Sequence, residues 1–164
     1  MTEVTPKILL AGWIDGAVRS FGYVAGSRGI KNFLKGAAEV AVGHIRQAAQ
    51  EQGINPPSTS DPLVCLQNIA AAETALEILP EGHLSLEPGD NSVVLSMLGC
   101  PYAHICTGIL GDLIKSNFSR EALPCLRTEV YAAAVSAECQ RKCKYTLQQF
   151  APGERCTSAI EFLP

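Results

Sequence analysis

With 164 residues, of which 47% are hydrophobic and 18% charged, the chain has the size and composition of one folded domain and not those of a disordered segment. The net charge is −3 and the lysines and arginines are scattered, which argues against nucleic-acid binding, where basic residues gather into a stripe with interleaved aromatics. No apolar run approaches the roughly 18 residues of a membrane span, and no cationic segment typical of a secretory signal precedes the first one. We therefore expect a cytoplasmic protein without a membrane span.

The first half of the chain is predicted to be helical. Thr5-Pro6 combines an N-cap with a proline at the first helical position, and apolar residues then recur at helical spacing as far as Gly26, which is expected to end the helix. A second helix is expected over residues 29–52. Asp61-Pro62 repeats the cap-and-proline pattern and predicts a third helix, which runs to about Leu79.

In the second half the period of the pattern changes to that of strands. Two β-hairpins are predicted, with strands over residues 83–86 and 92–98 and over residues 144–150 and 156–162. Between them we expect helices over residues 101–117 and 120–138, the second either starting near Pro124 or broken by it. The predicted fold is a single α+β domain, residues 1–164, in which N-terminal helices pack with a four-stranded antiparallel sheet made of the two hairpins.

Three segments carry a resemblance to a known family. They are the glycine-rich Phe21–Ile30, the Cys100-Pro-Tyr-Ala103 segment after a strand, and the closing hairpin, where a turn at Pro152-Gly153 precedes Cys156. With the order of elements, they resemble the 4-vinyl reductase (hydrocarbon-binding) domain family, which is related to TRAPP transport-complex subunits and haem-nitric-oxide sensor domains.

The resemblance implies a pocket, enclosed by helices and sheet, for a small apolar or tetrapyrrole-like ligand. Some members also hold zinc near the pocket through a Glu, a Cys and the Cys that opens the last strand. Only the last of these matches here, at Cys156; Gln148 stands where the family has a Cys, so a metal would need other ligands. The aromatic candidates for the pocket wall are Trp13, Phe21, Tyr23, Phe33 and Tyr102.

Six of the seven cysteines follow residue 99, and in a reducing cytosol they are thiols, metal ligands or redox groups more often than structural disulfides. Cys100 is placed at a predicted helix N-terminus, where the helix dipole favours a thiolate, and His104 lies one turn further on the same face. These two residues could act as nucleophile and base or as two metal ligands. The alternative is that Cys100 caps the helix and His104 makes a local hydrogen bond.

A second group of cysteines is a candidate metal site. If the preceding helix continues, Cys139 and Cys143 share one of its faces, and the final hairpin could bring Cys156 close to them. Such thiolates would suit zinc or an iron–sulfur cluster. Burial as small hydrophobic residues is the alternative.

Three functions remain open on this basis. The first is a binding domain for a hydrophobic or tetrapyrrole-like ligand, with or without a cysteine-ligated metal. The second is a cysteine-dependent or metal-assisted hydrolase or reductase that uses Cys100 and His104. The third is an interaction module or homodimer assembled through helix faces, with small-residue stripes at Ala37, Ala38 and Val42 or at Ala132–Ala134.

Overall fold

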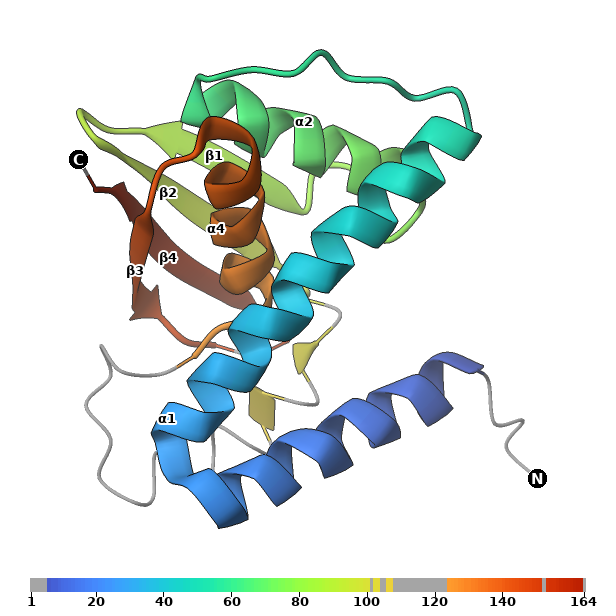
Figure 1. The fold of residues 1–164 in the computed structure, drawn as a ribbon, viewed down its shortest axis with the longest axis vertical. Helices are drawn as coiled ribbons and strands as arrows, with labels where there is room; N and C mark the ends of the chain where they lie inside the picture. Colours follow the sequence, from blue (N-terminus) through green and yellow to red (C-terminus); the bar gives the residue numbers. More distant parts are fainter. Residues whose placement is uncertain (1–5, 101, 104–105, 108–123, 152, 164) are drawn as a thin grey trace.

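The computed structural model describes residues 6–100, 102–103, 106–107, 124–151 and 153–163. Three long helices and a four-stranded sheet are present among them (Figure 1). The helices are α1 (Pro6–Glu51), α2 (Pro62–Ala75) and α4 (Leu126–Cys139). The strands are β1 (Leu84–Pro88), β2 (Ser92–Leu98), β3 (Cys143–Gln149) and β4 (Arg155–Phe162). The predicted α+β class is confirmed.

The sheet has the order β1-β2-β4-β3 and each neighbouring pair is antiparallel, so both predicted hairpins form and join through β2 and β4. Alternate side chains of β2 are buried, namely Val93, Leu95 and Met97. This alternation places one face of the sheet against the helices and leaves the other less covered.

Two separate helices were predicted over the residues that form the single helix α1. The chain stays helical through Gly26 but kinks there, with φ 60° and ψ −162°, a conformation that favours glycine. Beyond the kink, six side chains at three- and four-residue spacing are buried: Ile30, Leu34, Ala38, Val42, Ile45 and Ala49. Before it, α1 projects from the body of the domain (Figure 1), and Trp13 and Val24 are 82% and 84% exposed.

Helix α2 begins as the cap-and-proline pattern predicts. The Asp61 carboxylate accepts hydrogen bonds from the backbone N–H of Leu63 at 2.8 Å and of Val64 at 3.3 Å, and Pro62 opens the helix. The helix ends at Ala75, before the expected Leu79, because the chain turns at a left-handed Glu77 with φ 56°.

Helix α4 is shorter at its start than predicted. Pro124 and Cys125 lie outside it, Cys125 is its N-cap, and the helix runs from Leu126 to Cys139 before a left-handed Gln140. Proline lacks the N–H that an interior helical position needs, so it ends the preceding segment instead of joining the helix. The helix predicted over residues 101–117 lies mostly outside the described residues; within it Ala103, Cys106 and Thr107 are helical.

The elements are layered, with α4 between the sheet and the C-terminal part of α1, and α2 beside it (Figure 1). The small residues Ala38 and Val42 of α1 and Ala132–Ala134 of α4 are buried within the chain itself, because small side chains let helices approach closely. Of the first stripe only Ala37 is exposed, so these buried residues are used for packing inside the domain, and assembly through helix faces stays a prediction.

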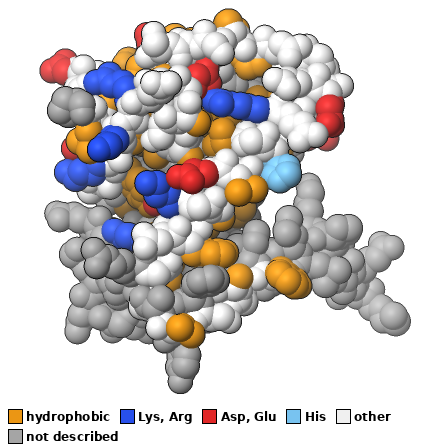
Figure 2. Space-filling view, in the orientation of Figure 1, with side chains coloured by type: hydrophobic (Ala, Val, Ile, Leu, Met, Phe, Trp, Pro, Cys, Tyr) orange, Lys and Arg blue, Asp and Glu red, His pale blue; other side chains and the backbone are white. Residues whose placement is uncertain are grey.

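Two features of the structure relate to the predictions about nucleic-acid binding and membrane spans. On the face shown in Figure 2, lysine and arginine side chains lie among acidic ones. Across the described residues, no helix combines the length and the apolar character needed to cross a bilayer.

Candidate functional site

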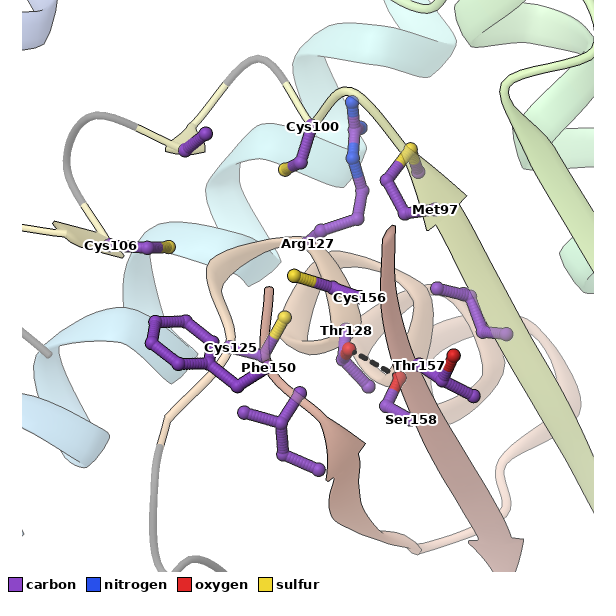
Figure 3. Close-up of a pocket in the computed structure, with 13 residues that line it drawn as sticks. Met97, Cys100, Cys106, Cys125, Arg127, Thr128, Phe150, Cys156, Thr157 and Ser158 are labelled. Atoms are coloured by element: carbon purple, nitrogen blue, oxygen red, sulfur yellow. Dashed lines mark hydrogen bonds between the residues drawn. The ribbon is translucent and has the colours of Figure 1, made fainter. Parts of the chain in front are cut away.

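Four cysteines from four separate segments converge on one cavity (Figure 3). Cys100 follows β2, Cys106 lies in the short helical segment after it, Cys125 is the N-cap of α4, and Cys156 lies on β4 opposite Met97 of β2. Leu95, Leu147 and Phe150 add apolar wall, and the free volume is about 20 Å³. Such a volume holds about one water molecule.

Burial disfavours the thiolate form at three of these four cysteines. Burial raises the pKa of Cys100, Cys106 and Cys156. At Cys100 a hydrogen bond from the backbone N–H of Tyr102 and the charge of Arg127 act in the opposite direction, as expected for a thiol at the start of a helical turn, but burial outweighs them. Burial therefore opposes the thiolate form that a nucleophilic Cys100 would need.

A buried arginine lies at the edge of the cavity, beside Cys100 (Figure 3). The Arg127 side chain is 2% exposed; it forms an ion pair with Glu73, which is 1% exposed, and its guanidinium lies 5.4 Å from the centre of the Tyr102 ring. Glu73 also accepts a hydrogen bond from the Tyr131 hydroxyl at 2.7 Å. The Nε and Nη2 atoms of Arg127 are buried and have no hydrogen-bond partner within the described part of the chain, which is unusual for a buried cation.

The floor of the cavity is tied together by a pair of buried hydroxyls. Thr128 of α4 and Ser158 of β4 lie 2.8 Å apart and satisfy each other (Figure 3). Each residue is 2% exposed or less. This bond fixes the first turn of α4 against the sheet directly below the thiols.

A second polar chain holds the N-cap of α4. The Tyr145 hydroxyl accepts from the Cys125 backbone N–H and donates to the Glu129 carboxylate, both at 2.9 Å. Burial raises the pKa of Glu129, while the Tyr145 hydrogen bond and the charges of Lys35 and Lys31 lower it by less. The backbone N–H of the N-cap residue is thus bonded by a side chain from β3.

The predicted metal site at Cys139, Cys143 and Cys156 is not assembled. Helix α4 ends at Cys139, so Cys143 opens β3 and shares no helix face with it. Cys143 pairs with Phe162 and Cys156 with Met97, which separates them by six residues along β4, roughly 20 Å at the rise of a strand. Burial raises the pKa of Cys143 to about 11.

The described side chains that line the cavity do not form a zinc site either. Four sulfurs line it, yet within the described part of the chain no three Cys, His, Asp or Glu side chains are grouped so as to hold a metal ion. Gln148 on β3, where the resembled family has a cysteine, removes one soft ligand. We therefore derive no step through a metal or iron–sulfur cluster.

The remaining candidates divide into three groups. Trp13 is 82% exposed and far from a pocket wall, whereas Phe33 and Tyr102 pack with Ile30 and Leu34 next to Arg127. The side chains of Phe21 and Tyr23 lie outside the described residues. His104 does too, so its pairing with Cys100 stays a prediction.

Sequence reasoning missed Glu73 and Arg127. A signal was available, because Arg127 and Tyr131 are one helical turn apart at the start of a largely apolar stretch, and Glu73 lies in a run of alanines. A charge inside an apolar helix usually has a partner.

A search of family models and of curated proteins found no match to this sequence.

Proposed function

We propose that the domain binds a small, largely apolar molecule that carries a hydrogen-bond acceptor, in the cavity lined by Cys100, Cys106, Cys125, Cys156 and Arg127. The observation that carries this proposal is an apolar, thiol-lined cavity that borders an almost wholly buried guanidinium, whose Nε and Nη2 atoms have no hydrogen-bond partner among the described residues. A buried donor without an acceptor costs about 1–3 kcal/mol, so an occupant with an oxygen at this place would be stabilising.

The apolar and thiol wall supports an apolar body for this ligand. The free volume of about 20 Å³ is far below the roughly 300–1,000 Å³ of sites for drug-sized ligands, so a tetrapyrrole does not fit, and a four-carbon molecule enters only if the cavity wall moves outward. The resemblance to the hydrocarbon-binding family points to the same class of function, but it rests on short motifs and on the order of elements.

A thiol enzyme is the weaker proposal. It requires a reactive Cys100, and burial raises the pKa of that thiol. The predicted base, His104, lies outside the described residues, so we do not propose a reaction.

Short four-carbon probes test the binding proposal. The thermal midpoint of the purified protein is measured with butyrate, 1-butanol and 1-chlorobutane at matched concentrations. We expect stabilisation by the two oxygen-bearing probes and little by 1-chlorobutane, which lacks a good acceptor. Cys156→Leu fills the cavity and should abolish the effect, whereas Cys143→Ser, at the start of β3 and opposite the far end of β4, should keep it. Equal responses in all three proteins, or none, would contradict the proposal.

A further inference from the structure

A second group of thiols lies at the opposite end of α4 from the cavity. Cys65 is in the first turn of α2 and Cys139 is the last residue of α4. The Cys65 thiol donates to Glu138 Oε2 at 3.7 Å, and the Cys139 thiol donates to the backbone carbonyl of Thr59 at 3.6 Å. The N–H of Thr59 in turn donates to Glu138 Oε1 at 3.0 Å, so both thiols belong to one small network.

The two thiols are also neighbours of each other. Burial raises the pKa of both; a hydrogen bond between the two side chains raises that of Cys65 further and opposes the rise at Cys139. Of the two, Cys139 is thus the one more easily deprotonated. It is also the more accessible, since it is half-buried whereas Cys65 is 1% exposed.

A small polar reagent can approach Cys65 through a hollow, whereas Cys139 does not line that hollow and is itself partly exposed to solvent. Cys65 and Glu138 line a hollow of about 360 Å³ whose wall includes Arg46 and Asn68. Arg46 forms an ion pair with Glu138 beside the thiol. The hollow is large enough for hydrogen peroxide and the water that surrounds it.

We propose that Cys65 and Cys139 are an oxidisable pair that hydrogen peroxide converts into an intramolecular disulfide between α2 and α4. Cys139 loses its proton and attacks the peroxide, so that a sulfur–oxygen bond forms, the oxygen–oxygen bond breaks and one water leaves. Cys65 then gives its proton to Glu138 and attacks the resulting sulfenic sulfur. The sulfur–sulfur bond forms, and the departing hydroxide takes the proton as a second water.

The test uses the full, reduced chain. It is exposed to hydrogen peroxide, its remaining thiols are blocked with N-ethylmaleimide, and the unreduced digest is mapped by mass spectrometry. We expect a peptide pair linked through Cys65 and Cys139, with both thiols lost from the blocked pool at the same rate. Cys143→Ser is the matched control and should leave the link intact.

Other outcomes overturn the proposal. One is a disulfide between Cys139 and Cys143. The other is a Cys65 that still reacts fully with N-ethylmaleimide while Cys139 or the cavity cysteines are oxidised. Glu138→Gln should slow the second step several-fold, and an unchanged rate would refute Glu138 as proton acceptor. The mapping reads the wild-type chain, so it does not depend on whether a Cys65 variant folds, nor on whether the cavity binds a ligand.

Discussion

The guanidinium of Arg127 and the carboxylate of Glu73 meet in the interior, where each side chain is 2% exposed or less. Both charges have left water, so each depends on the other for compensation. Arg127→Met or Glu73→Gln alone leaves one buried charge unpaired, and we expect either to lower the free energy of unfolding by about 3–5 kcal/mol. Urea unfolding measures the loss.

The double variant makes this prediction sharper. Removing both charges avoids the stranded ion, so Arg127→Met with Glu73→Gln should cost far less than the two single losses added together. Additive losses in this double-mutant cycle would show that the two residues are not coupled as the structure indicates.

Glu129 makes the stability of the protein depend on pH. Because burial raises its pKa in the folded state, the folded protein binds this proton more tightly than the unfolded chain does. The free energy of unfolding should therefore fall as pH rises from the ordinary carboxyl value, 4.5, through the folded pKa, and stay lower above it. Glu129→Gln should remove this fall and be more stable than wild type at neutral pH, with the advantage vanishing in acid.

Tyr145→Phe is the companion variant for that measurement. It removes the hydrogen bond that lowers the pKa of Glu129, so the fall in stability should extend to higher pH. A wild-type profile identical to that of Glu129→Gln would contradict this account.

The hydroxyl pair of Thr128 and Ser158 should behave as a unit. Thr128→Val or Ser158→Ala leaves one buried hydroxyl without a partner and should cost about 1–3 kcal/mol, whereas the double variant should be closer to wild type than the sum. Chemical denaturation of the four proteins gives the comparison. A double variant as poor as the sum would mean that packing, not the bond, is lost.

The cavity thiols should be slow nucleophiles. Burial raises the pKa of Cys100, Cys106 and Cys156, so we expect each to react with iodoacetamide at pH 7.5 more slowly than free cysteine, and at the ordinary rate in urea. Alkylation followed by peptide mapping separates the three sites. Fast reaction of native Cys100 would instead revive a nucleophilic role.

Most of the secondary structure could be predicted from local sequence patterns. The Asp61 cap and the two hairpin turns are signals within a few residues, and the structure forms each of them where it was expected. Gly26 was also recognised, but a glycine marks only that the backbone can change direction, and here it kinks α1 where a full stop was expected.

The site was less accessible to such reasoning, because it depends on which distant segments meet. The sheet register, set by β2 pairing with β4, separates Cys143 from Cys156 and brings Cys156 to Cys100 and Cys125. Spacing along the chain contains no information on that register until the strand order is known. The Glu73–Arg127 pair is likewise a meeting of two helices far apart in sequence.

The most direct test of the binding proposal is calorimetric titration with butyrate of the wild-type protein and of the Arg127→Met, Glu73→Gln double variant. The double variant lacks the Arg127 guanidinium, which the proposal assigns as donor to the ligand oxygen. Circular dichroism verifies that both proteins are folded. We predict saturable binding to the wild type that is weakened at least tenfold in the double variant. Equal affinity in the two proteins, or no binding by the wild type, would contradict the assignment of the cavity as a ligand site.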